Sequence, residues 1–177
     1  MKIIKLLFLP VVVLLMSSCS SIQVATDYDS KTDFNQYKTF AFYKKGIDKS
    51  AISDLDKKRI MRAIEAELLA KGMTKSSSPD VLVNLYAKSR ERVNVDDNFY
   101  GGFYYPWYYG VNPITVSQYT EGTLFIDLLD ANKKELVWQG IGTGALSSGG
   151  SVEQKEALIK EFVEQIMAKY PPESTKK

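Results

Sequence analysis

Residues 122–146 read GTLFIDLLDANKKELVWQGIGTGAL, and this stretch predicts a β-hairpin. Its two halves, residues 122–130 and 135–146, are rich in the β-branched, aromatic and aliphatic residues typical of strands. The DANKK segment between them favours a turn, because the short polar side chains of Asp and Asn bond the nearby backbone. The hairpin is therefore the element around which the rest of the fold must be arranged.

Alternate residues of a strand point to the same face of a sheet, so this hairpin has an apolar face. We expect Leu124, Ile126 and Leu128 to share that face in the first half. In the second half Trp138 alternates with Leu136, which predicts that they share a face and that Trp138 is a core residue. Three glycines follow on alternate positions, where they would allow a bulge or the close approach of a helix: Gly140, Gly142 and Gly144.

Two segments have the apolar spacing of amphipathic helices. The first, residues 53–71, begins at the N-cap residue Ser53 and is followed by Gly72, a residue suited to a C-terminal cap. The second begins with a capping box of Ser151 and Gln154 and ends before Pro171. The apolar stripes of the two helices consist of Ile60, Ile64 and Leu68 in the first, and Leu158, Ile159, Phe162, Val163, Ile166, Met167 and Tyr170 in the second.

Three further segments, residues 22–29, 36–43 and 80–89, have the alternating pattern of strands. Helices and strands with one apolar face each need one another to form a core. The sequence therefore predicts an α+β fold, an antiparallel sheet of five or six strands with two helices packed on one face. This single domain spans residues 19–172 and is followed by a polar tail, residues 173–177.

The N-terminus has the layout of a secretory signal. Lys2 and Lys5 precede an apolar run, Leu6 to Met16, and small residues follow it. Such a run rises about 16 Å as a helix, too short for a hydrocarbon core of about 30 Å. We therefore expect residues 1–18 to be a cleaved signal peptide rather than a transmembrane anchor.

The segment Leu15-Met16-Ser17-Ser18-Cys19 resembles a bacterial lipoprotein box, in which cleavage before the cysteine leaves it as the acylated first residue. The alternative is an ordinary signal that ends near a cysteine. Cys19 is the only cysteine of the chain, and lipidation would explain an otherwise unpaired thiol in an exported protein. The sequence thus predicts lipidation at Cys19 and a membrane partner held through that anchor.

The residues after Cys19 bear on the location of the protein. Ser20 stands where an Asp would resemble an enterobacterial inner-membrane retention signal, and SSIQVATD lacks the early acidic cluster that resembles a surface-export signal. These features favour the cell envelope, at the periplasmic face of the outer membrane. Removing Lys2 and Lys5 leaves equal numbers of basic and acidic side chains, so no electrostatic footprint for nucleic acid remains.

Several stretches in order resemble one family: VATDYDSKTDFNQYKTFAF, AIEAELLAKGM, SPDVLVNLYAK, YTEGTLFIDLLDANKKELVWQGIGTGAL and the closing KYPP. Together they are similar to the bacterial lipoproteins of domain of unknown function 4136, over roughly residues 22–172. The resemblance implies an outer-membrane or periplasmic lipoprotein, often with a Gly- and Tyr-rich middle segment. It implies no activity, because none is established for the family, and it transfers no catalytic residues.

The chain contains no histidine, which removes His-based nucleophile activation, His general bases and His-ligated zinc. Carboxylates could still gather for calcium or acid/base chemistry, at Asp27, Asp29 and Asp33 or at Asp127 with Asp130. Turn capping is the simpler interpretation of the first group. Asp127 would face outward or satisfy a neighbouring backbone group. The sequence therefore predicts no enzyme activity, metal site or cofactor, and a carboxylate-dependent hydrolase is the weakest alternative.

Residues 99–110, FYGGFYYPWYYG, place eight aromatic residues in 12 positions. The segment has no strand periodicity and is broken by glycine and proline, so we expect a loop. One hypothesis is a stacking surface for a glycan, a small ligand or an envelope protein, formed by Phe103, Tyr104, Tyr105, Trp107, Tyr108 and Tyr109. The alternatives are that the rings fold back over an open end of the sheet, or that the loop has no specific ligand.

Two functions follow from these patterns. The first is a non-enzymatic lipoprotein at the outer membrane with an accessory, structural or binding role in the cell envelope. The second is a glycan-binding or small-ligand-binding module that uses the aromatic loop.

Overall fold

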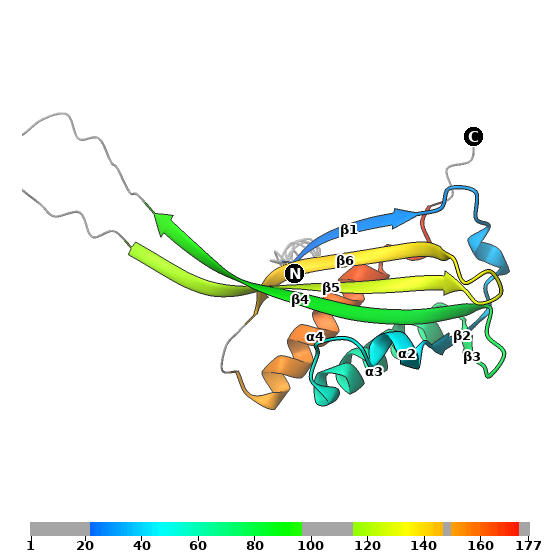
Figure 1. The fold of residues 1–177 in the computed structure, drawn as a ribbon, viewed down its shortest axis with the longest axis horizontal. Helices are drawn as coiled ribbons and strands as arrows, with labels where there is room; N and C mark the ends of the chain where they lie inside the picture. The colour runs from blue at the N-terminus through cyan, green and yellow to red at the C-terminus, as the bar shows by residue number, and fades with distance from the viewer. Residues whose placement is uncertain (1–21, 97–114, 147–149, 174–177) are drawn as a thin grey trace, which may run out of the picture.

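The computed structural model describes residues 22–96, 115–146 and 150–173, which form an α+β fold with a six-stranded sheet (Figure 1). The strand order is β1-β6-β5-β4-β2-β3. The strands are β1 Gln23–Tyr28, β2 Thr39–Phe42, β3 Thr74–Lys75, β4 Val81–Asp96, β5 Thr115–Asp130 and β6 Leu136–Leu146. The helices are the 3-10 turn η1 Phe34–Gln36, the short α2 Lys44–Ile47, and the longer α3 Asp54–Ala70 and α4 Val152–Met167.

The sheet is mixed, which corrects the prediction of an antiparallel sheet. β1, β6, β5 and β4 do pair antiparallel, but β2 pairs parallel with both β4 and β3. The reason is the connection from β2 to β4, which contains α2 and α3. A parallel pair of strands needs such a crossover, and a helix is its usual content. The predicted helix at residues 53–71 is therefore the crossover that makes this part of the sheet parallel.

The predicted hairpin is confirmed as β5 and β6, with one irregularity. Leu128 pairs with Trp138 but Leu129 pairs with Leu136, so Val137 is an extra residue in β6. Such a β-bulge interrupts the alternation of faces. Trp138 is fully buried as predicted, whereas Leu136 is 50% exposed. The prediction that Leu136 and Trp138 share a face is therefore wrong, because the bulge lies between them.

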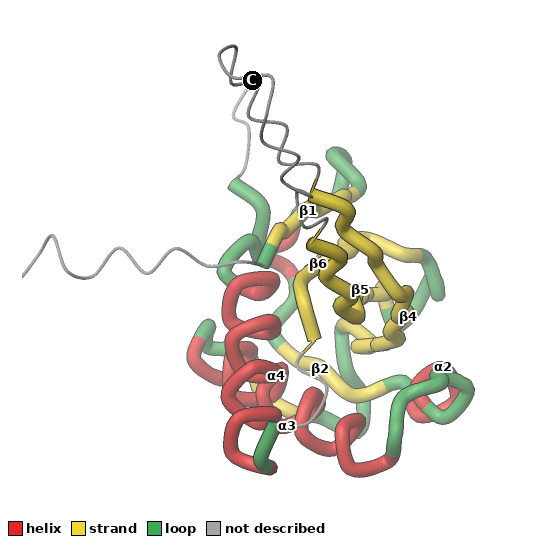
Figure 2. Tube along the Cα trace, turned by 90° about the vertical axis from the view of Figure 1, so that its left-hand side faces the viewer, coloured by secondary structure: helices red, strands yellow, loops and turns green. Residues whose placement is uncertain are grey.

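Both long helices lie on one side of the sheet, as predicted (Figure 2). Ser53 caps α3 by accepting a hydrogen bond from the Asp56 amide, and Gly72 after the helix has a φ of 83°. The capping box of α4 is complete, since the side chains of Ser151 and Gln154 each accept from the other's backbone amide. The sequence signals for the helix ends therefore predicted the boundaries closely.

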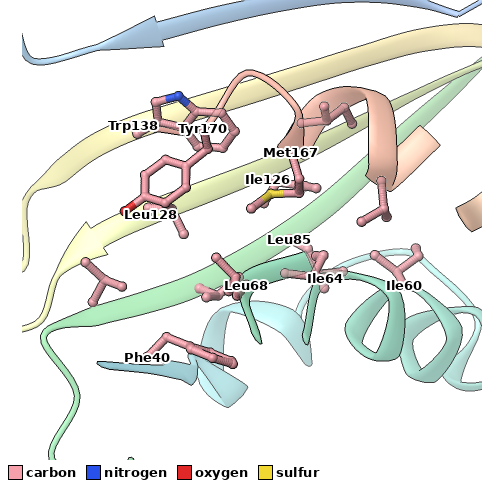
Figure 3. Packing of buried hydrophobic residues seen from close by; sticks show 14 of the residues in the cluster. Phe40, Ile60, Ile64, Leu68, Leu85, Ile126, Leu128, Trp138, Met167 and Tyr170 are labelled. Carbon is pink, nitrogen blue, oxygen red and sulfur yellow. The ribbon is translucent and has the colours of Figure 1, made fainter. Parts of the chain in front are cut away.

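The core lies between the helices and the sheet (Figure 3). The largest fully buried side chains come from every layer: Trp138, Phe40, Ile64, Leu68, Leu85, Ile126, Leu128, Ile166 and Met167. α4 approaches β6 closely at the glycines. A Cβ placed on Gly142 would lie 2.7 Å from Ile166 Cδ1, and one on Gly144 would lie 3.0 Å from Phe162 Cζ. The expectation of close helix packing at these glycines is confirmed.

β4 and β5 are longer than predicted. The third strand was expected to end at Ser89, but β4 continues to Asp96, which pairs with Thr115 at the start of β5. β6 reaches only as far as the pair Thr120 with Leu146. The far ends of β4 and β5 therefore form a two-stranded arm beyond the body of the sheet, which Figure 1 shows clearly.

Candidate functional site

The residues that the sequence singled out for function lie outside the described part of the chain. They are Cys19 and the aromatic loop residues Phe103, Tyr104, Tyr105, Trp107, Tyr108 and Tyr109. Lipidation and ligand stacking therefore stay predictions. The structure does fix the points from which both segments depart. Ile22 immediately precedes β1, and the paired residues Asp96 and Thr115 lie at the tip of the arm.

A cavity of about 620 Å³ lies between the N-terminal halves of α3 and α4 and the helix-facing side of the sheet. Two small residues line it, Ala87 of β4 and Gly122 of β5, where the neighbouring positions carry Leu85 and Leu124. Leu146 covers Gly122, since a Cβ on that glycine would lie 2.7 Å from Leu146 Cδ1. The walls are mostly apolar and include Ile60, Leu124, Leu146, Leu158, Ile159 and Phe162. The cavity can therefore accommodate an apolar group that the body of the core has no room for.

Asp56 in the cavity wall is paired with two cations. Lys155 Nζ lies 3.4 Å from Asp56 Oδ2, and Arg59 Nη1 lies 2.8 Å from Asp56 Oδ1. Burial opposes ionisation of Asp56, but hydrogen bonds from Ser53 and Arg59 and the charge of Lys155 outweigh it and lower the pKa of this carboxyl. The charge of Asp56 is therefore balanced by neighbouring cations, and Lys88 is a further cation of the wall.

Sequence reasoning missed this cavity. The signal was present in β4, where the helix-facing series Val81, Val83, Leu85 ends in the smaller Ala87. In β5 the equivalent series begins with Gly122 before Leu124. Both small residues lie at the arm end of the sheet, but only the register of Ala87 with Leu124 and of Ser89 with Gly122 shows that they are neighbours.

In the first group of carboxylates, Asp29 and Asp33 cap turns, which confirms the simpler interpretation for these two. Asp27 instead lies within β1 and accepts from the Tyr28 amide at 2.9 Å. Asp29 accepts hydrogen bonds from the Lys31 amide at 2.9 Å and the Thr32 hydroxyl at 3.1 Å, and these bonds lower the pKa of Asp29. Asp33 accepts from the Asn35 amide at 3.0 Å and caps η1. Among the described residues, no group of three or more carboxylates or thiolates could hold a metal ion.

Asp127 lies on the face of the sheet opposite the helices, yet it is 9% exposed. Its carboxylate accepts from Gln139 Nε2 at 2.8 Å and from Asn84 Nδ2 at 3.4 Å. Asp127 therefore faces away from the helices, as one expectation had it, while the expected bond to backbone is replaced by bonds from two side-chain amides. Burial raises the pKa of Asp127 above its usual value, and the two hydrogen bonds offset part of this rise.

Asp130, three residues further on, has a different role. It caps the β5–β6 turn by accepting from the amides of Asn132 and Lys133, both at 2.9 Å, and it accepts from the Tyr37 hydroxyl at 3.1 Å. The turn amides lower the pKa of Asp130, while burial and the Asp130 carboxylate raise the pKa of Tyr37 to about 12. The two carboxylates thus have separate partners and do not form an acid/base pair.

Two aromatic rings lie near Asp127 on the same face. Tyr86 and Phe125 stack with a centroid distance of 4.4 Å and an interplanar angle of 5°. Lys88 Nζ lies 5.6 Å from the Phe125 centroid. Stacking of the two rings and the contact of the Lys88 ammonium group with Phe125 both stabilise this face of the sheet.

Three solved structures are similar to this chain. A PDZ domain protein from Parabacteroides distasonis is 19% identical with a TM-score of 0.50, and the match covers 86% of this chain but only 36% of that protein. A PelC dodecamer from Paraburkholderia phytofirmans is 10% identical with a TM-score of 0.49, covering 83% of this chain and 95% of that one. A minor lipoprotein from Acinetobacter baumannii is 11% identical with a TM-score of 0.43, covering 76% and 92%. At these identities the likeness concerns the fold alone.

A comparison with curated proteins found no match. Within the described segments, no helix combines the length and apolar character needed to cross a membrane. The family comparison is decisive, because the model described as Domain of unknown function (DUF4136) matches residues 24–172, nearly the whole domain predicted from the sequence. This chain therefore belongs to the DUF4136 family, as its sequence pattern had suggested.

Proposed function

We propose that this protein is a lipoprotein anchored through Cys19 to the periplasmic face of the outer membrane, with a non-enzymatic accessory, structural or binding role. The observation that carries the proposal is the N-terminal sequence, a basic start, a short apolar run and a small-residue segment ending in the chain's only cysteine. More than one acyl chain on that cysteine would give stable anchoring, where a single chain would be marginal.

The geometry of the domain agrees with a short anchor. β1 begins at Gln23, four residues after Cys19, so only a short tether would separate the lipid from the first strand. The folded domain would therefore sit close to the membrane surface. A domain held this way would contact partners close to the membrane surface, because the short tether prevents it from diffusing away.

Fractionation of cell envelopes tests this proposal. The natural protein should float with the outer membrane on a density gradient, and Cys19→Ala should abolish its maturation and its outer-membrane recovery. Ser21→Ala is the matched control and should leave both unchanged. In an enterobacterial host, Ser20→Asp should shift the protein to the inner membrane. Recovery of the Cys19→Ala protein, processed and in the outer-membrane fraction, would contradict the proposal.

Recognition through the aromatic loop is the second candidate, and one observation favours it. The loop's two attachment points, Asp96 and Thr115, pair with each other at the tip of the arm, five pairs beyond the last pairing of β5 with β6. Loops carried on a rigid scaffold away from a core are common sites of binding. Tyr and Trp are the residues that suit such contacts with sugar rings.

Tryptophan fluorescence separates this candidate from a plain structural loop. The chain has two tryptophans, and Trp138 is fully buried, so a ligand on the loop should change the emission of Trp107. We expect a saturable change when peptidoglycan fragments are added, and no change in a Trp107→Phe variant. If the emission of the natural protein does not change with these fragments, the loop does not bind this glycan and the second candidate is rejected.

A further inference from the structure

We propose that the cavity between α3, α4 and the sheet holds one acyl chain carried by Cys19. This inference rests on the proposed function, because it requires that Cys19 be lipidated. It adds a specific role for the cavity, which would hold the domain in a fixed orientation beside its own anchor.

The chemistry of the cavity suits an acyl chain. Its volume of about 620 Å³ lies within the range of roughly 300–1,000 Å³ found for small-ligand sites. The walls contain the aliphatic side chains of Ile60, Leu124, Leu158 and Ile159. A saturated chain offers no hydrogen-bond donors or acceptors, so it loses nothing on leaving water for such walls.

The charges at the cavity also fit this occupant. Asp56 is paired with both Lys155 and Arg59, at 3.4 Å and 2.8 Å. The diacylglyceryl group on a lipoprotein cysteine has no charge of its own. Because Asp56 is already balanced by these cations, an uncharged lipid needs no counter-ion from this part of the wall.

The position of Ile22 brings the anchor within reach. A Cβ placed on Gly144 would lie 3.0 Å from Phe162 Cζ and 3.3 Å from Ile22 Cγ1, so both side chains cover the same glycine. Phe162 also forms part of the cavity wall. Cys19 precedes Ile22 by three residues, a span of at most about 10 Å. The acyl groups on Cys19 can therefore reach the cavity without any change in the domain.

The direction of β1 agrees with this placement. β1 runs antiparallel to β6, and its first residue, Gln23, pairs with Thr143 near the end of β6. Leu146 at that end of β6 is also part of the cavity wall. The chain before Ile22 therefore joins the domain at the end of the sheet that holds the cavity, and β1 runs from there toward the opposite end.

Burial of one chain is compatible with anchoring. A cysteine that carries a diacylglyceryl group and an additional acyl chain has three chains. One chain in the cavity would leave two for the membrane, which are enough for stable binding. It would also fix which end of the domain faces the membrane, with the N-terminal ends of α3 and α4 toward the lipid.

Photo-crosslinking of the natural protein tests the inference. Cells are fed a fatty acid that bears a diazirine in its chain, their membranes are irradiated, and the purified protein is digested and analysed by mass spectrometry. We expect crosslinks from the lipid on Cys19 to cavity residues such as Leu158 and Ile159. A labelled Cys19 that crosslinks only to membrane lipid, or to residues outside the cavity, would overturn the inference and leave the proposed function standing. An unlabelled Cys19 would overturn both.

A cavity-filling variant gives an independent control. Ala87→Leu adds bulk to the cavity wall and should remove the crosslinks while Cys19 stays labelled. Ala41→Leu is the matched change in β2, which is not part of the cavity wall, and should retain them. Circular dichroism checks that both variants fold. If crosslinks to Leu158 persist at full strength in folded Ala87→Leu, the chain lies elsewhere and the inference fails. The crosslinks of the natural protein decide the matter even if this variant does not fold.

Discussion

Asp127 and Asp130 lie three residues apart in β5, and their surroundings shift their pKa values in opposite directions. Burial dominates at Asp127, whose two hydrogen bonds come from the side-chain amides of Gln139 and Asn84. Backbone amides of the turn dominate at Asp130. At the residue scale, an ionised aspartate is thus destabilising at position 127, where it is buried, and stabilising at position 130, where it accepts from the amides of a turn.

The stability of the fold should therefore respond to pH with opposite signs in two variants. A raised folded-state pKa means that folding favours the neutral form of Asp127, so the contribution of this carboxyl is fully present below its unfolded pKa, where it is protonated, and is lost as pH rises through the folded-state pKa. Asp127→Asn should accordingly gain stability, relative to the natural protein, as pH rises above the unfolded-state pKa of about 4. The lowered pKa of Asp130 means that its ionised form stabilises the fold, and this contribution is present above the unfolded pKa and lost as pH falls through the folded-state pKa. Asp130→Asn should therefore be most destabilising near pH 7 and least at low pH.

Urea unfolding at a series of pH values measures both profiles. The two variants serve as controls for each other, because they remove the same charge from the same strand. Parallel profiles for the two variants would show that the net charge of the protein, rather than local burial and hydrogen bonding, sets the response.

At the scale of elements, the contact of α4 with β6 depends on the absence of side chains on the strand. A Cβ on Gly142 would lie 2.7 Å from Ile166 Cδ1 and 2.9 Å from Ile166 Cγ1. Ile166 is fully buried, so it has little room to move aside. Interiors are packed closely enough that one added methyl group is felt.

Gly142→Ala should therefore destabilise the fold by about 1–3 kcal/mol, the usual cost of an overpacked core. Ile166→Val removes the Cδ1 atom of the closest contact, so the double variant should lose less stability than the two single variants added together. Thermal or urea unfolding of the four proteins gives this coupling. Additive losses would mean that Ile166 is not what resists a side chain at Gly142.

The elements show where sequence reasoning succeeds. The capping residues Ser53, Ser151 and Gln154 predicted the helix starts, because the side chain of a cap bonds a backbone amide only three residues away. The alternation of Leu124, Ile126 and Leu128 predicted one buried face of β5. Signals of this kind need no knowledge of the rest of the chain.

Other features depend on contacts between distant residues and escaped prediction. The parallel pairing of β2 with β4 depends on where the crossover helix returns the chain. The bulge at Val137 depends on its partner strand. The cavity requires that Ala87 and Gly122 become neighbours of α3 and α4, and that pairing exists only in the folded sheet. The sequence predicted fold class and candidate anchor, but not this site.

At the scale of the whole molecule, the domain has two distinct ends along the sheet. The arm of β4 and β5 extends from one end (Figure 1), and the cavity and the start of β1 lie where the arm leaves the body. At the opposite end lie the β5–β6 turn and Tyr170, which packs edge-on against Trp138 with a centroid distance of 5.3 Å. An anchor before β1 would thus hold the cavity end toward the membrane.

The central claim is that Cys19 is the lipid-bearing first residue of the mature protein. The direct measurement is the mass of the N-terminal peptide of the protein purified from cell membranes. The account predicts a peptide that begins at Cys19 and carries a diacylglyceryl group and an additional acyl chain. A peptide that begins at another residue, or at Cys19 with a free thiol, would contradict the account.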